Sequence, residues 1–192
     1  LRDEKAEVPL DQIKQLGKLG FMGIMVPEKW NGAGMDTVSY ALAMEEISRI
    51  DASAGVIISV NNSLVCQIFL DWANNQQCNK YLKKLAGGEW LGAFSLSEPQ
   101  SGSDASNMLT FAEKSNGYYI LNGTKNWVSN GISSDVIIVF ALTKKGIGHK
   151  GVSAFLIEKG TPGLSTGKKE EKLGIRGSDT CELFFENCKI PK

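Results

Sequence analysis

Two short stretches of the sequence combine residue types that could bind a polar, planar ligand. The first, residues 91–104 (LGAFSLSEPQSGSD), begins with an alternating apolar pattern and breaks at Pro99 into a turn rich in serine and glycine. Where a strand ends in such a turn, backbone N–H groups lose their ladder partners and can point into one concavity. The serine hydroxyl groups add donors and acceptors. The stretch predicts either a site for carbonyl oxygens, ring nitrogens or phosphates, or an ordinary corner between a strand and a loop.

The second stretch, residues 122–131 (NGTKNWVSNG), places Trp127 close to Ser129 on a strand between two Asn-Gly turns. A planar heteroaromatic cofactor needs a broad face for stacking and hydrogen-bond donors at its edge, and a tryptophan beside a hydroxyl group offers both. The alternative is that Trp127 packs in the core of a β domain, because a large aromatic ring is most often buried.

The composition limits the classes of partner. With 192 residues and 42% hydrophobic content, the chain is long enough to bury a sizeable core. Lysine plus arginine equal aspartate plus glutamate at 21 each, so no basic surplus is available for a nucleic acid or an anionic membrane. The most apolar uninterrupted runs, 136–142 and 55–60, are far shorter than the ~20 residues of a membrane span. We expect a soluble protein with no nucleic-acid partner and no membrane span.

The cysteine and histidine residues predict no metal site. The four cysteines have no CxxC spacing, and the single histidine, His149, lies in a polar segment. Packed thiols in a reducing compartment are favoured over disulfide bridges.

The elements that would position the two stretches differ between the halves of the chain. Apolar periodicity predicts helices near residues 10–19, 37–49, 52–72 and 76–86. The third helix is apolar on most faces, which favours burial, yet Asn61, Asn62 and Ser63 interrupt it. Buried polar side chains need partners, so these three form either a packed hydrogen-bond cluster or the lining of a ligand cavity.

After Glu89 the apolar period changes to two, which predicts strands. The predicted strands are 91–97, 108–114, 118–121, 135–143, 152–158 and 182–187, with Asn-Gly turns at 122–123 and 130–131. Because no crossover helix separates them, a barrel or sandwich is favoured over a doubly wound fold. The fold class is therefore α+β, with an all-α N-terminal domain (1–89) followed by a small β domain (90–192).

Several separated motifs, in order, resemble one enzyme family. The runs AMEEISRIDASAGVIISVNNSL, FSLSEPQSGSDASN, LNGTKNWVSNG and GVSAFLIEKGTPGLSTGKKEEKLGIRGSDTCELFFENCKIP are similar to acyl-CoA dehydrogenases, most of all to the short-chain, butyryl-type members. The similarity extends roughly from Ile13 to Pro191.

The resemblance implies a helical domain, a middle β domain and a C-terminal four-helix domain, with FAD between the last two. The sequence resembles a fragment trimmed at both ends, because it opens without an initiator methionine and Lys192 falls where the family's middle domain ends.

The resemblance also implies roles for individual residues. Phe94, Leu96 and Ser97 would lie at the pyrimidine edge of the flavin. Trp127 would pack on the isoalloxazine, and Ser129, with Val128 between them, would donate toward N5. Ser103 would contact the cofactor region and the CoA part of the substrate.

Two positions depart from the family pattern. The family usually has glycine at the position of Gln100 and often threonine at the position of Ser129. Serine retains the hydroxyl group. Glutamine would be strained if the position needs a positive φ, unless Ser101 and Gly102 carry the turn instead.

The implied reaction is FAD-dependent α,β-dehydrogenation of short-chain acyl-CoA to trans-2-enoyl-CoA, in fatty-acid or branched-chain amino-acid breakdown. The catalytic base is expected beyond Lys192, so this chain holds no catalytic residue. Glu98 is expected to fix its loop by accepting hydrogen bonds from the backbone or a lysine. Electron-transfer flavoprotein would accept the electrons, and the full-length protein would be a homotetramer. It would lie in the mitochondrial matrix if eukaryotic and in the cytoplasm if bacterial.

Two other functions remain open. One is an acyl-CoA oxidase-like enzyme, which passes electrons to oxygen. The other is a non-catalytic CoA- or flavin-binding scaffold module. Arg176 could form an inter-domain salt bridge or contact the cofactor.

Overall fold

The computed structural model describes residues 2–192, which form two compact units. The helical unit contains the chain up to Gly92 together with Glu171–Asp179, and the sheet unit contains Ala93–Glu170 and Thr180–Lys192. The predicted α+β class, helices first and then a β domain, is confirmed. The domain limits 1–89 and 90–192 stay a prediction, and the short segment 171–179 lies with the helical unit although strands flank it on both sides.

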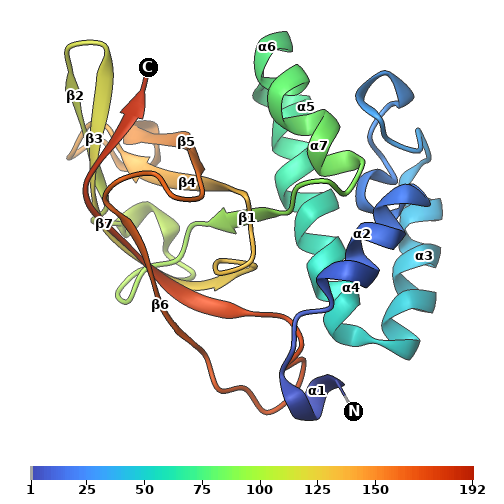
Figure 1. Cartoon of the computed structure of the whole chain (residues 1–192). Helices are drawn as coiled ribbons and strands as arrows, with labels where there is room; N and C mark the ends of the chain where they lie inside the picture. Colours follow the sequence, from blue (N-terminus) through green and yellow to red (C-terminus); the bar gives the residue numbers. More distant parts are fainter. Residues whose placement is uncertain (1) are drawn as a thin grey trace. The chain divides into compact units, whose positions relative to one another are not determined.

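The helical unit is built from short helical segments, several of which join end to end (Figure 1). All four predicted helices are present. The segments are α1 (Arg2–Lys5), α2 (Leu10–Lys18), η1 (Phe21–Gly23), η2 (Glu28–Trp30), α3 (Thr37–Ile50), α4 (Ala52–Ser59), η3 (Val60–Cys66), α5 (Gln67–Trp72), α6 (Asn75–Gln77), η4 (Cys78–Leu82) and α7 (Lys83–Ala86).

The central helix of this unit runs without a break from Ala52 to Trp72, through α4, the π-helical η3 and α5. The Asp51 side chain caps its start by accepting from the Ala54 N–H group at 3.1 Å. By length and composition alone, this helix of 21 residues could cross a membrane. The uninterrupted apolar runs in the sequence are shorter, so they did not indicate such a helix. Its two buried asparagines bond to neighbouring segments, so we interpret it as a core helix.

Asn61 and Asn62 form a packed hydrogen-bond cluster in the middle of that helix. Both side chains are buried and bond to backbone groups of the same unit. The Asn61 amide donates to Met22 O at 2.8 Å and Leu85 O at 3.2 Å, and its oxygen accepts from Gly92 N at 3.0 Å. The Asn62 amide donates to Phe21 O at 2.9 Å and Ile58 O at 3.0 Å, and its oxygen accepts from Ile24 N at 2.8 Å. The cluster prediction is confirmed for these two residues, and the cavity alternative is wrong for them.

The sheet unit is one curled sheet of seven strands (Figure 1). The strands are β1 (Gly92–Ser95), β2 (Phe111–Ser115), β3 (Tyr118–Ser129), β4 (Val136–Leu142), β5 (Val152–Glu158), β6 (Leu164–Lys169) and β7 (Thr180–Pro191). Their order is β1-β4-β2-β3-β7-β6, and β5 pairs with β4. Strand β6 was not predicted from the sequence, because its residues, LSTGKK, are mostly polar and none is buried.

The turn predicted at Asn122-Gly123 is wrong, because both residues lie inside the twelve-residue strand β3. The pairing of β3 with β7 shifts register between Leu121 and Gly123. Gly123 has φ of 148°, and a Cβ atom there would come within 2.4 Å of the Thr110 hydroxyl group. Glycine is therefore needed for a close approach of two segments at a bulge, not for a turn.

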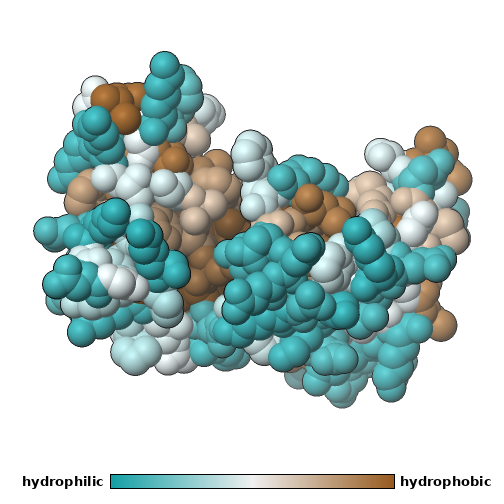
Figure 2. Space-filling view, turned by 90° about the horizontal axis from the view of Figure 1, so that it is seen from above, coloured by the Kyte–Doolittle hydropathy of each residue, from teal (hydrophilic) through white to brown (hydrophobic). Residues whose placement is uncertain are grey.

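The core of the sheet unit is apolar and contains two of the cysteines. Cys181 and Cys188 lie with Leu121, Val128 and Leu183 in one buried cluster. Cys66 and Cys78 are buried thiols as well, as the sequence analysis predicted. On the face that Figure 2 shows, the surface is mostly hydrophilic, with separate hydrophobic patches.

Candidate functional site

The end of β1 leads into a loop that its own backbone closes. The Glu98 N–H group donates to Ser101 O at 2.9 Å, and the Ser101 N–H group donates back to Glu98 O at 3.1 Å. The Ser101 hydroxyl group donates to Asp104 O at 2.7 Å. Gln100 is not among the described residues with a positive φ, so the strain considered for it does not arise. The predicted turn after Pro99 is confirmed.

Trp127 lies at a β-bulge in β3. Lys125 is opposite Leu183 and Val128 is opposite Cys181, so two residues of β3 face one residue of β7. Trp127 has a left-handed backbone with φ of 58°, which costs a non-glycine residue about 1–3 kcal/mol. The bulge buries both Lys125 and Val128 and leaves Trp127 64% exposed. The core-packing alternative is therefore wrong, and strain at an exposed aromatic residue is typical of functional sites.

The structure brings the two stretches singled out in the sequence together. The Asn126 N–H group donates to Ser97 O at 2.8 Å. The Lys125 ammonium donates to Leu96 O at 2.8 Å. These bonds join the end of β1 to the residues that precede Trp127, so the serine-rich loop and the bulge form one corner of the sheet unit.

Glu98 is the centre of this corner. Its carboxylate accepts from the Lys125 ammonium at 2.8 Å, the Leu109 N–H group at 2.6 Å, the Thr110 N–H group at 3.1 Å and the Gln100 amide at 2.7 Å. The prediction that Glu98 fixes its loop by accepting backbone or lysine hydrogen bonds is confirmed. Lys125 was not predicted from the sequence as a site residue. Its inward position in a strand was a signal, because a lysine is almost never fully buried unless it is paired.

The two charged groups of the corner shift each other's ionisation. Burial would raise the pKa of Glu98, but hydrogen bonds from Lys125, Thr110 and Leu109 outweigh it and hold that pKa below its ordinary value of 4.5. Burial lowers the pKa of Lys125 from its ordinary value of 10.5, and Glu98 opposes that shift. We assign the charged form to both at neutral pH, because their separation of 2.8 Å is that of a charge-assisted hydrogen bond.

The other predicted site residues differ in what they can present to a ligand. Leu96, Ser97 and Ser129 are half-buried, and Ser103 is exposed on the loop. The Phe94 ring packs against Phe140, with the ring centroids 5.1 Å apart. Val128 is buried in the sheet core, so any contact of Val128 with a ligand would come from its backbone.

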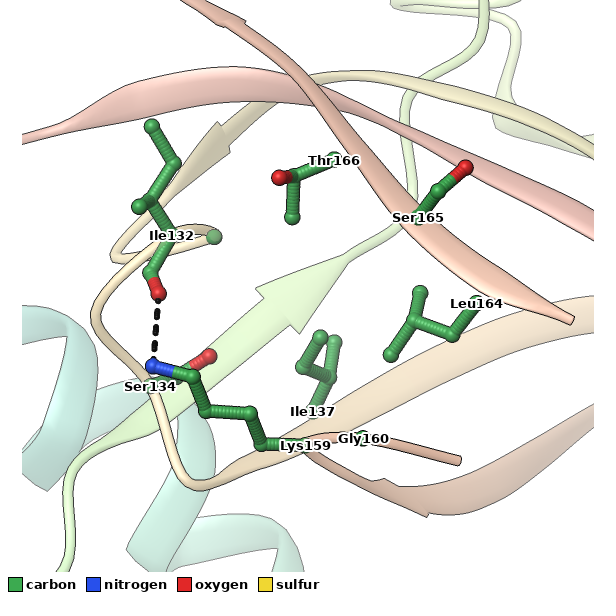
Figure 3. A pocket seen from close by; sticks show the side chains of 9 residues that line it. Ile132, Ser134, Ile137, Lys159, Gly160, Leu164, Ser165 and Thr166 are labelled. Carbon is green, nitrogen blue, oxygen red and sulfur yellow. Dashed lines mark hydrogen bonds between the residues drawn. The ribbon is translucent and has the colours of Figure 1, made fainter. Parts of the chain in front are cut away.

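The sheet unit also contains a pocket of about 460 Å³ (Figure 3). Its lining residues are Gly131, Ile132, Ser134, Ile137, Lys159, Gly160, Leu164, Ser165 and Thr166. In Figure 3 the Lys159 side chain extends to the Ile132 carbonyl oxygen, to which it donates at 3.2 Å. Gly131, the last residue of the second stretch, lines this pocket, but none of the residues to which the resemblance assigns a role does.

Comparison with known families tests the resemblance drawn from the motifs. Residues 93–188 match the family model described as acyl-CoA dehydrogenase, middle domain, and residues 1–89 match the one described as acyl-CoA dehydrogenase, N-terminal domain. The chain belongs to the acyl-CoA dehydrogenase family. The resemblance drawn from the motifs is confirmed.

Curated acyl-CoA dehydrogenases are similar over the whole chain. An acyl-CoA dehydrogenase of Bacillus subtilis is 50% identical over 100% of this chain and 51% of its own length. The human mitochondrial short-chain specific acyl-CoA dehydrogenase is 47% identical over 99% of this chain and 46% of its own length. The chain thus spans about half the length of the curated relatives it matches.

Solved structures of acyl-CoA dehydrogenases have the same fold. Butyryl-CoA dehydrogenase from Megasphaera elsdenii has a TM-score of 0.95 at 41% identity, over 99% of this chain and 51% of that chain. A glutaryl-CoA dehydrogenase from Mycobacterium smegmatis in complex with FADH2 has a TM-score of 0.91 at 35% identity, over 98% of this chain and 47% of that chain. A chain in a structure described as the electron transferring flavoprotein of Acidaminococcus fermentans has a TM-score of 0.97 at 43% identity, over 100% of this chain and 50% of that chain.

Proposed function

We propose that the whole protein is an FAD-dependent dehydrogenase of short-chain acyl-CoA thioesters, which it converts to trans-2-enoyl-CoA in fatty-acid or branched-chain amino-acid breakdown. The observation that carries the proposal is the exposed Trp127, held at a strained bulge next to the serine-rich loop. The similarity to short-chain and butyryl-CoA dehydrogenases supports the substrate class.

The corner formed by the loop and the bulge fits FAD. Trp127 offers an exposed aromatic face, and the half-buried Ser97 and Ser129 offer hydroxyl groups beside it. When bound, FAD supplies the acceptor for the hydride that leaves the β-carbon of the substrate. A relative described as a complex with FADH2 supports the choice of cofactor.

The residues of this chain would bind and orient the cofactor and substrate. Phe94, Leu96 and Ser97 would line the pyrimidine edge, where backbone and hydroxyl donors stabilise the charge that develops on reduction. Trp127 would cover one face of the ring system, and Ser129 and the Val128 backbone would lie near N5. Ser103, exposed on the loop, would contact the CoA part of the substrate.

The base that removes the α-proton would come from outside these residues. A base needs a carboxylate within about 3 Å of the proton that it removes. The Glu98 side chain is only 2% exposed and accepts bonds from four groups, so it is unsuited to that role. We expect the base on a segment that follows Lys192 in the whole protein.

The partners follow from the same family. Electron-transfer flavoprotein would receive the electrons, and the whole protein would be a homotetramer. Relatives include mitochondrial and bacterial proteins, so the mitochondrial matrix is expected in a eukaryote and the cytoplasm in a bacterium. For Arg176, the structure records its backbone N–H group as a donor to the Asp3 carboxylate. The inter-domain and cofactor roles of the Arg176 side chain stay predictions.

The experiment is purification of the full-length protein and anaerobic addition of butyryl-CoA. We expect a yellow protein whose flavin band bleaches on addition of substrate. A protein without flavin absorbance would support the scaffold alternative. Rapid oxygen consumption with acyl-CoA in air would support the oxidase alternative.

A further inference from the structure

We propose that the buried Lys125–Glu98 pair strengthens the Ser97 backbone N–H group as a hydrogen-bond donor to the flavin and thereby raises the flavin's reduction potential. The inference rests on the proposed function, because it requires FAD at the corner formed by the loop and the bulge. It assigns Lys125 and Glu98 as positioning residues that act through the backbone without touching the cofactor.

The peptide that joins Leu96 to Ser97 has its two polar groups in different surroundings. Its carbonyl oxygen accepts from the Lys125 ammonium at 2.8 Å, and the Lys125 side chain is fully buried. In a trans peptide the C=O and N–H groups point in opposite directions, and the described chain has no cis peptide. The Ser97 N–H group therefore points away from Lys125. No acceptor in the described part of the chain is paired with it, whereas the Ser97 carbonyl accepts from Asn126.

A cation bound to a carbonyl oxygen polarises the whole peptide group. Electron density shifts toward the oxygen, which leaves the N–H hydrogen more positive, and the effect is larger in a buried site than in water. A flavin gains negative charge at N1 and the C2 carbonyl when it is reduced, so a stronger donor there stabilises the reduced form more than the oxidised form.

Glu98 keeps the ammonium in place. Its carboxylate anchors Lys125 on one side and the backbone of Leu109 and Thr110 on the other. Gln100, where the family usually has glycine, adds a further donor to the same carboxylate. Lys125 therefore has two acceptors, Leu96 O and Glu98, and its ammonium is held against the peptide next to the site.

The test is the midpoint reduction potential of bound FAD in the full-length holoenzyme. Lys125→Met removes the cation, and we expect the equilibrium to shift about tenfold toward oxidised flavin, which is about 30 mV for a two-electron couple. Gln100→Gly is the matched control, because it removes one donor to Glu98 and leaves the ammonium on Leu96 O. We expect this control to keep the wild-type potential.

A Lys125→Met holoenzyme with the wild-type potential would overturn the inference, and so would an equal shift in Gln100→Gly. If Lys125→Met does not fold, Lys125→Met/Glu98→Gln, which leaves no unpaired buried charge, is measured against the same expectation. A wild-type protein that binds no FAD would overturn the proposed function as well. An unchanged potential in flavin-containing variants overturns only the inference.

Discussion

The two units each contain a buried polar cluster, and the two clusters differ in charge. In the helical unit, the neutral amides of Asn61 and Asn62 bond to backbone groups. In the sheet unit, Lys125 and Glu98 form an ion pair whose side chains are 0% and 2% exposed. Burying a neutral amide requires only hydrogen-bond partners, whereas burying charges costs several kcal/mol per ion before pairing.

The more costly cluster lies at the candidate site. In other proteins, replacement of a buried ion pair by well-packed apolar residues of similar size has often been neutral or stabilising. In the helical unit, the buried polar cluster of Asn61 and Asn62 is neutral. The charges at the corner are therefore explained better by an electrostatic effect on the neighbouring peptide than by stability, and this difference is open to experiment.

The largest effect is expected from breaking the ion pair on one side. Lys125→Met leaves the Glu98 carboxylate buried without a countercharge, which should lower the free energy of unfolding by about 3–5 kcal/mol. Lys125→Met/Glu98→Gln should recover most of that loss. Urea denaturation of the two variants and the wild type measures both values. Equal losses in the single and double variants would show that the pair itself supplies the stability.

A smaller loss is expected in the neutral cluster. Asn62→Leu leaves the Ile24 N–H group and the Phe21 carbonyl without their partner, which should cost about 1–3 kcal/mol. The flavin reduction potential of the full-length protein should not change. Ser63→Ala is the control, because its hydroxyl group donates to Ser59 O within the same helix, and it should stay within about 0.5 kcal/mol of the wild type. A potential shifted by Asn62→Leu would remove the distinction between the clusters.

The acid side of the stability profile distinguishes the clusters further. The pKa of Glu98 lies below its ordinary value of 4.5 in the folded protein. As the pH falls past 4.5, the carboxylate therefore takes up a proton in the unfolded state before it does so in the folded state. The stability that ionised Glu98 contributes is fully present above about pH 4.5, and it is lost as the pH falls through the pKa of Glu98 in the folded protein. We expect the gap in unfolding free energy between the wild type and Lys125→Met/Glu98→Gln to change across this range, and the gap for Asn62→Leu to stay constant. A constant gap for both would contradict the lowered pKa.

Much of the fold could be predicted from local patterns. The helix 52–72 and the buried strand β4 contain apolar runs whose lengths suit a buried helix and a buried strand, and the break at Pro99 marks the loop. The polar strand β6 could not be predicted, because pairing with β7 rather than burial holds it in the sheet. The segment 171–179 has no local signal for its place beside the helices.

The candidate site was predictable in its residue types but not in its geometry. The pairing of an aromatic residue with hydroxyl groups identified Trp127 and Ser129, and the family resemblance supplied their proposed roles. The exposure of Trp127 depends on a bulge whose register is set by the partner strand β7, which lies more than fifty residues away in the sequence. The burial of Lys125 likewise depends on Glu98, a partner from the loop after β1.

The most direct test of the account is the affinity of the full-length protein for FAD after Trp127→Ala. Because Trp127 is 64% exposed, the variant should fold as the wild type does and bind FAD about tenfold more weakly, which corresponds to about 1.4 kcal/mol. Trp72→Ala, which removes a tryptophan that is 84% exposed in the helical unit, should leave FAD binding unchanged. Unchanged FAD affinity in a folded Trp127→Ala protein would contradict the assignment of the site.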